Sequence, residues 1–167
     1  MVILGIDPGY AITGYGVLRY KNNSFRVLDY GVVRTSADSP FPERLLAIQQ
    51  ALIELLDLYK PDCVAIEELF FSRNTTTAIG TAQARGVAIV TAASANLPVY
   101  EYTPMQVKVA VTGYGRAEKQ QVQEMVRILL NLTEKPNPDD VADALAVAIC
   151  HAHSGNRDSA LAVGGYQ

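Results

Sequence analysis

The first third of the chain alternates apolar runs with short polar breaks, and this pattern predicts three neighbouring strands. Residues 2–6 form a continuous apolar run that ends at Asp7, as in a strand covered on both faces. Residues 15–20 and 25–34 are rich in β-branched and aromatic side chains, and the turn-forming residues 21–24 separate them. The chain is therefore expected to open with a strand followed by a hairpin.

Helical spacing replaces this alternation in the next segment. Apolar residues recur at helical spacing over residues 42–59, until Lys60 and Pro61 stop the segment. A short apolar run at residues 63–66 predicts another strand, and that strand ends in a second carboxylate, Glu67.

The second half of the chain continues with predicted helices and one more strand. In chain order these are a helix over 75–95, a strand over 99–102, and helices over 104–111, 117–130 and 138–151. The order indicates an α/β fold, a five-stranded mixed sheet flanked by helices. Residues 1–153 are expected to form one domain and residues 154–167 a flexible tail.

Charge adds little to this picture. A net charge of −3 in 167 residues speaks against binding nucleic acid through bulk charge, because phosphate recognition usually leaves a basic footprint. Residues 68–127 nevertheless carry six basic residues against four acidic ones. This middle segment is either a surface that follows phosphates or only a solvated face.

The cysteines and the first residues bear on the compartment. Cys63 and Cys150 lie inside apolar runs and cannot define a disulfide framework, so a reducing compartment is expected. The first residues lack the basic segment of a signal peptide, and no stretch is long enough to span a membrane. We therefore expect a cytoplasmic protein without membrane contact.

Four carboxylates stand where they could meet. Asp7 and Glu67 end two predicted strands, and Asp140 and Asp143 lie one helical turn apart, on the same helix face. Hydrolysis of a phosphodiester requires charge neutralisation and an activated water, and hard divalent cations held by oxygen ligands supply both. The set therefore indicates a magnesium-dependent nuclease site.

Other assignments are possible for the polar residues of the last helix. Asp139 is interpreted as an acid that only complements the helix dipole. Asp143 lies in an apolar series, where an unpaired charge is costly, so it needs a partner such as a metal ion. The group from Cys150 to His153 lacks the spacing of a zinc site and is interpreted as a helix end with a buried thiol.

Several motifs resemble one known family over residues 2–153, in order and without large gaps. They are Gly5-Ile6-Asp7-Pro8-Gly9, Thr13-Gly14-Tyr15-Gly16, Ala65-Ile66-Glu67, Gln83-Ala84-Arg85-Gly86-Val87, Gln106-Val107-Lys108, Ala117-Glu118-Lys119 and Asp140-Val141-Ala142-Asp143-Ala144-Leu145-Ala146. The chain is similar in these motifs to the RuvC crossover junction endodeoxyribonucleases. The resemblance implies a ribonuclease H-like fold and a homodimer that resolves Holliday junctions, four-way DNA junctions, by paired symmetric nicks. It also implies a role in recombination and DNA repair, with the branch-migration proteins RuvA and RuvB as partners.

The resemblance also assigns roles to residues. It implies that Asp7, Glu67, Asp140 and Asp143 are catalytic and bind Mg²⁺, with two ions in each active site and Mn²⁺ able to substitute. Glu68 competes with Glu67, but the family pattern places the acid directly after Ala-Ile, and strand alternation points the two side chains in opposite directions. The implied DNA contacts are Phe70, Arg73, Lys108 and Lys119.

Three other functions compete with junction cleavage. The segment from Asp7 to Gly16 also resembles the first phosphate loop of actin-like ATPases and sugar kinases, which need a second lobe and a second phosphate loop. A junction-binding protein without activity is expected to lack one or more of the carboxylates. An RNA-processing nuclease of the same superfamily is separated only by substrate competition.

The helix predicted over 75–95 is a candidate dimer interface. Ala78, Ala82 and Gly86 give it a face of small residues, which permits close approach of a second backbone. The alternative is that this face packs only on the sheet of its own chain.

Overall fold

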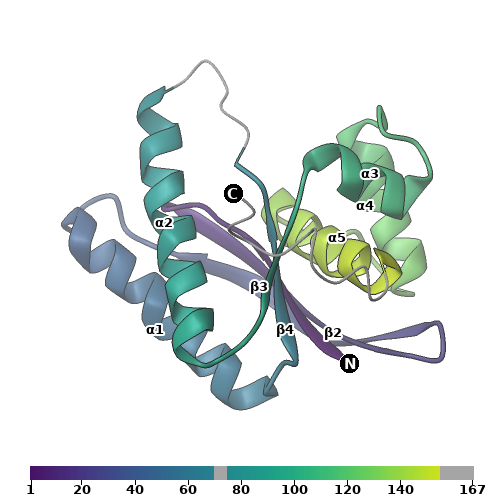
Figure 1. Ribbon diagram of the computed structural model, residues 1–167. Helices are drawn as coiled ribbons and strands as arrows, with labels where there is room; N and C mark the ends of the chain where they lie inside the picture. Colours follow the sequence, from purple (N-terminus) through teal and green to yellow (C-terminus); the bar gives the residue numbers. More distant parts are fainter. Residues whose placement is uncertain (70–74, 155–167) are drawn as a thin grey trace, which may run out of the picture.

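A computed structural model describes residues 1–69 and 75–154 of the chain. Five strands form one sheet in the order β3-β2-β1-β4-β5, and helices cover both of its faces (Figure 1). The strands are β1 (Val2–Asp7), β2 (Ile12–Lys21), β3 (Ser24–Arg34), β4 (Cys63–Glu67) and β5 (Val99–Tyr102). The helices are α1 (Phe41–Tyr59), α2 (Thr75–Ser94), α3 (Pro104–Thr112), α4 (Lys119–Leu129) and α5 (Asp139–Ser154). The predicted α/β class and the mixed five-stranded sheet are confirmed.

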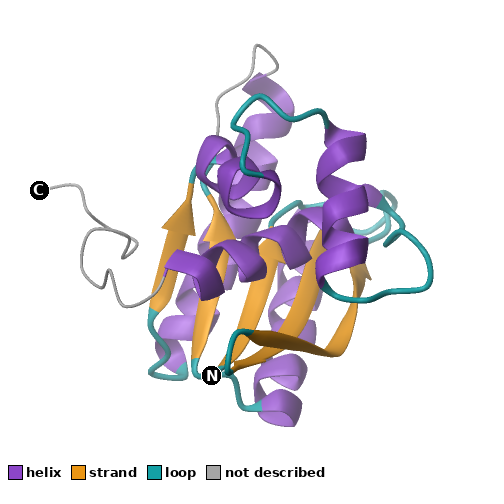
Figure 2. Ribbon diagram, turned by 90° about the vertical axis from the view of Figure 1, so that its right-hand side faces the viewer, coloured by secondary structure: helices purple, strands orange, loops and turns teal. Residues whose placement is uncertain are grey.

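The sheet changes direction at β1, its central strand. β1 pairs antiparallel with β2 and parallel with β4, and β5 continues the parallel half. Figure 2 shows the strands running side by side between the helices. Because parallel strands end at the same edge, the carboxyl ends of β1 and β4 lie next to each other.

The two faces of the sheet have separate cores. Alternate residues of β1 and β4, such as Leu4 and Val64, face α1 and α2. The intervening residues, such as Ile3 and Ala65, face α5 and its neighbours α3 and α4. Strand alternation therefore decides which helices a residue at a strand end will meet.

Helix α5 rests almost directly on the strand backbone. A Cβ atom at Gly5 would lie 2.2 Å from the carbonyl oxygen of Ala144, and one at Gly14 would lie 2.0 Å from that of Asp140. Only glycine permits this approach. The two glycines belong to the adjacent strands β1 and β2. Because they lack side chains, they fix how closely α5 approaches the sheet and where it lies on it.

The end of α5 differs from the prediction. The helix was expected to end near His151, with a tail from residue 154, but Ser154 is its last residue. The additional turn forms because His151 and Ala152 are buried and the Ser154 hydroxyl donates a hydrogen bond to the Cys150 carbonyl. The rest of the predicted tail lies outside the described residues. Among the described helices, none combines the length and apolar character that a bilayer crossing requires.

Candidate active site

Asp7 and Glu67 end two adjacent parallel strands. The register pairs Ile6 with Ile66, which places the two acids side by side at the edge of the sheet. Asp7 is four residues after Ile3 and Glu67 is two residues after Ala65, so strand alternation points both side chains toward the α5 side of the sheet. Both are partly exposed. Glu68 follows the last residue of β4, and it lines one hollow together with Asp7 and Glu67, so strand alternation does not separate it from these two acids.

The first turn of α5 adds the other two carboxylates. Asp140 and Asp143 are both partly buried. The backbone of Asp140 lies against Gly14, which pairs with Asp7 across β1 and β2. The glycine contact therefore brings the amino end of α5 to the strand ends that carry Asp7 and Glu67.

The other three acids are close enough to influence the charge of Asp7. Burial, with repulsion from Glu67, Asp143 and Asp140, raises the pKa of Asp7 to about 8. Burial and the charge of Asp143 raise the pKa of Glu67 to about 7. Burial also raises the pKa of Asp143. Negative charge is therefore concentrated here beyond what the nearby side chains neutralise.

Two lysines supply positive charge at the cleft. The Lys119 Nζ atom lies 3.2 Å from an oxygen of Asp143 and 3.2 Å from an oxygen of Asp139. Although burial opposes it, the charge of Asp143 raises the pKa of Lys119. Lys108 lowers the pKa of Glu67 without cancelling the rise. The structure thus places both lysines that the family resemblance assigned to DNA beside the carboxylates.

Two hollows open around Glu67 and Pro104, which line both. One, of about 210 Å³, is lined by Glu67, Pro104, Val107, Lys108, Lys119, Val122 and Asp143. The other, of about 190 Å³, is lined by Asp7, Pro8, Glu67, Glu68, Leu69, Thr81 and Pro104. Together they form a cleft that is lined by the carboxylates of Asp7, Glu67 and Asp143 and by the two lysines.

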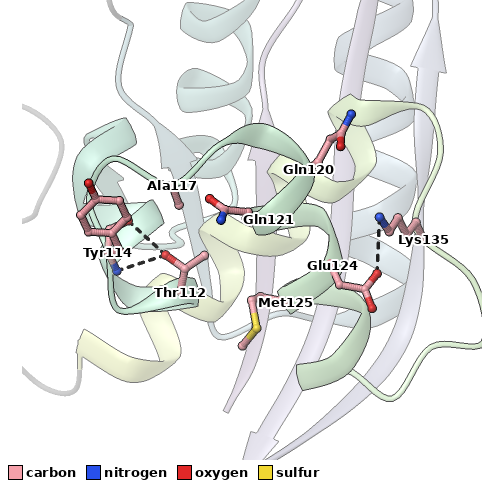
Figure 3. Close-up of a pocket in the computed structure, with 8 residues that line it drawn as sticks. All are labelled: Thr112, Tyr114, Ala117, Gln120, Gln121, Glu124, Met125 and Lys135. Atoms are coloured by element: carbon pink, nitrogen blue, oxygen red, sulfur yellow. Dashed lines mark hydrogen bonds and ion pairs between the residues drawn. The ribbon is translucent and has the colours of Figure 1, made fainter.

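A larger hollow of about 490 Å³ lies elsewhere, between the end of α3 and the outer side of α4 (Figure 3). The acid in it is Glu124, which pairs with Lys135 at 3.5 Å and with Arg127 at 2.6 Å. Its remaining lining is mostly amides and small or apolar side chains. A carboxylate that is already neutralised does not suit metal or phosphate chemistry, so the smaller cleft is the candidate active site.

The donors of the cleft suit a hard divalent cation. Carboxylate oxygens are the ligands that magnesium prefers, and mutual repulsion is relieved when a cation binds. Within residues 1–69 and 75–154, no three acidic, histidine or cysteine side chains are arranged to hold a metal ion as they stand. Lys119 instead contacts Asp143, one of the four acids.

The comparison with known families decides what kind of cleft this is. The family model described as Crossover junction endodeoxyribonuclease RuvC matches residues 3–151. The chain belongs to the RuvC family. A RuvC from Alkaliphilus metalliredigens is 61% identical over 159 residues, which cover 95% of this chain and 97% of the relative. The resemblance inferred from the motifs is confirmed.

Solved RuvC structures agree with the fold over nearly the whole chain. Thermus thermophilus RuvC matches with a TM-score of 0.89 at 41% identity, covering 98% of this chain and 100% of the other. The same enzyme in complex with a Holliday junction substrate matches with a TM-score of 0.92 at 42% identity, covering 98% and 99%. The ribonuclease H-like fold expected from the resemblance is confirmed.

The structure adds contacts to one of the assigned residues, and two others fall outside the part of the chain that it describes. Phe70 and Arg73 lie outside the described residues. Asp139 was interpreted as only a complement to the helix dipole, but its side chain also binds Lys119 and accepts a hydrogen bond of 2.6 Å from Gln123. The sequence held one signal for this contact, because Lys119 and Gln123 are one turn apart on the predicted helix.

Proposed function

We propose that this protein is a metal-dependent, structure-selective DNA endonuclease that resolves Holliday junctions by paired symmetric nicks in recombination and repair. One observation carries the proposal: Asp7, Glu67 and Asp143 line one cleft of a RuvC-family chain, and Asp140 is close enough to act on the charge of Asp7. Residues 1–153 act in it as a single nuclease domain.

The four carboxylates are proposed as the catalytic, metal-binding set, with Mg²⁺ as the natural ion, two ions per site, and Mn²⁺ as a substitute. When bound, such ions neutralise charge on the phosphate and lower the pKa of a coordinated water. The protein buries these acids and places them close together, which favours the binding of a cation between them. Lys108 and Lys119, on the side of the same cleft, are proposed to bind DNA phosphates.

Two further DNA contacts are proposed from the family resemblance. Phe70 is expected to stack on an unpaired base near the junction centre, and Arg73 to bind DNA close to it. Stacking of this kind is worth about 1–3 kcal/mol per base and favours opened DNA over intact duplex.

A homodimer is proposed because symmetric nicks in a junction of approximate two-fold symmetry require two equivalent sites. The outer face of α2 supports this arrangement. Ile79 and Val90 are 63% and 59% exposed, and a Cβ at Gly86, between them, would have no neighbour within 4 Å. At Gly86, one of the three small residues of the predicted interface, α2 therefore does not contact its own sheet, whereas Ala78 and Ala82 are half-buried. Ala84 and Ala88 of the same helix pack against the sheet.

The decisive experiment uses a synthetic four-way junction. Purified protein is incubated with it in magnesium or in chelator, and the nicks are mapped on each strand. Paired nicks at symmetric positions, in magnesium only, are expected, together with sedimentation as a dimer. Nicks on one strand only, or a monomer even when saturated with junction, would contradict the paired mechanism.

An RNA-processing nuclease of the same superfamily is the remaining competitor. Cleavage of the labelled junction in the presence of excess unlabelled structured RNA or excess unlabelled junction separates the two. Only the junction is expected to compete. RuvA and RuvB as partners and a cytoplasmic location complete the proposal.

A further inference from the structure

Lys119 forms ion pairs with two carboxylates that differ in exposure, Asp139 and Asp143. Its Nζ atom lies 3.2 Å from Asp143, whose side chain is 28% exposed, and 3.2 Å from Asp139, whose side chain is 56% exposed. Asp143 belongs to the cleft. Asp139 lies outside it, since neither hollow beside the proposed metal site is lined by Asp139.

Asp139 is itself held in place by α4. One of its oxygens contacts Lys119, and the other accepts a hydrogen bond of 2.6 Å from the Gln123 amide. Lys119 and Gln123 are one turn apart on α4, and Asp139 and Asp143 are one turn apart on α5. The four side chains therefore form a ladder between the two helices at the rim of the cleft.

The ladder matters because a metal ion and the Lys119 ammonium compete for Asp143. Two cations cannot both neutralise the same carboxylate oxygen at full strength. When a metal ion takes Asp143, Lys119 loses one ion pair and keeps the other, with Asp139. Without Asp139, the lysine would give up its last carboxylate partner in the ladder, and metal binding would cost more.

We propose that Asp139, oriented by Gln123, is a positioning residue that retains Lys119 at the rim of the cleft when Asp143 turns to a metal ion. This role rests on the proposed function, because it takes Asp143 as a metal ligand. It assigns a purpose to an acid that is neither in the cleft nor merely at a helix start.

The test measures metal binding by the full-length protein in the absence of DNA. Titration with Mn²⁺ is followed by the electron paramagnetic resonance signal of the free ion. Asp139→Asn is expected to raise the Kd for Mn²⁺ by about two- to fivefold, the range that one partly exposed ion pair supports. Gln123→Leu keeps the Asp139 carboxylate but removes the hydrogen bond that orients it. A smaller rise of the Kd for Mn²⁺ is therefore expected.

A double-mutant cycle distinguishes positioning from simple loss of negative charge. Lys119→Met removes the competing cation and is expected to lower the Kd. In the Lys119→Met background, Asp139→Asn is expected to change nothing, because there is no lysine left to retain. A matched control is Asp57→Asn on α1, which breaks an exposed ion pair of 2.9 Å with Lys60 and is expected to leave the Kd unchanged.

The outcomes separate this inference from the function on which it rests. If Asp139→Asn raised the Kd equally with and without Lys119, only bulk charge would be involved and the inference would be overturned. An unchanged Kd in the wild-type background would overturn it as well. A wild-type protein that bound no Mn²⁺ and cut no junction would instead remove the proposed function.

Discussion

Polar side chains cluster at both ends of α5, and the two clusters are built on opposite principles. At the amino end, Asp140 and Asp143 join Asp7 and Glu67, and burial together with repulsion between the acids raises the pKa values of Asp7 and Glu67. At the carboxyl end, His151 lies between neutral groups that satisfy it. One helix thus carries both a crowded set of like charges and a fully paired polar cluster.

The carboxyl-end cluster is built around a buried imidazole. Its Nδ1 atom lies 2.7 Å from the Tyr102 hydroxyl and its Nε2 atom 3.2 Å from the Cys63 sulfur. The Tyr100 ring packs on it at 4.5 Å between centroids. Burial raises the pKa of Cys63 to about 12, and it also raises that of Tyr102, so both partners stay neutral.

This difference indicates that the His151 cluster contributes to stability, whereas the four carboxylates contribute to chemistry. A buried neutral polar group that finds its partners costs the fold little. Carboxylates crowded together lower the free energy of unfolding. Such clusters are typical of functional sites, where a bound cation neutralises them. The predictions that follow test this separation.

The largest effect is expected at the amino end. Asp7→Asn should reduce junction cleavage to below about one thousandth, because the loss of a catalytic charge in such a site is worth at least this much. The substitution relieves repulsion, so the melting temperature should not fall and junction binding should persist. Single-turnover cleavage in magnesium, a gel-shift assay and a thermal melt measure the three quantities.

Glu67→Gln and Asp143→Asn are expected to behave in the same way. Asp140→Asn should be milder, because Asp140 lines neither hollow of the cleft. Near-normal nicking by the Asp7, Glu67 or Asp143 variant would remove that residue from the site.

The carboxyl end should show the reverse behaviour. His151→Ala leaves a cavity and two buried polar groups without their partner, so it is expected to cost about 2–4 kcal/mol of unfolding free energy. Cleavage per folded molecule should be unchanged. Urea unfolding and an activity assay on the folded fraction measure both.

His153→Ala is the matched control for that experiment. His153 is exposed, two residues further along the same helix, and its ring lies 3.2 Å from the Ala110 carbonyl. A loss under about 1 kcal/mol is expected. Equal losses for the two histidines would show that the buried cluster has no special weight.

Gly14→Ala, in the strand beneath α5, should reduce both stability and cleavage, whereas the Asp7 and His151 variants should each affect only one of them. Gly14→Ala places a Cβ atom 2.0 Å from the Asp140 carbonyl oxygen, so the helix must move away from Asp7. A loss of about 1–3 kcal/mol is expected, as for overpacked cores, together with reduced cleavage by the folded protein. Full activity in the folded fraction would mean that the cleft tolerates a displaced helix.

The last prediction concerns the pH dependence of stability. Asp7 and Glu67 have pKa values near 8 and 7 in the folded protein, above the 3.8 and 4.5 usual for these groups. Between about pH 4 and 8 the folded protein therefore binds more protons than the unfolded chain, and stability falls as pH rises. Melting temperatures in chelator should decline over this window, and Asp7→Asn should flatten the decline. Cys63 and Tyr102 should not contribute to this decline, because burial raises the pKa of both and they stay protonated over the whole window.

The amino-acid sequence predicts the parts of this site that lie on single elements. Asp7 and Glu67 end apolar runs, and the spacing of Asp140 and Asp143 is helical, so each position follows from local pattern. The sequence does not predict contacts between elements that are far apart in the chain. The approach of α5 to Gly14 and the bonds from α4 to Asp139 depend on tertiary packing, which no local periodicity encodes. The same holds for the contacts of His151 with Cys63 and Tyr102, because the three residues belong to elements that are far apart in the chain.

The dependence on α5 also has a consequence during protein synthesis. β1 and β4 deliver Asp7 and Glu67 early, but α5 is the last described element and supplies both Asp140 and Asp143. Until α5 leaves the ribosome, one face of the sheet lacks the helix that rests on Gly5 and Gly14. The nascent chain therefore holds only two of the four proposed site carboxylates, and a partly made enzyme has no complete cleft with which to cut DNA.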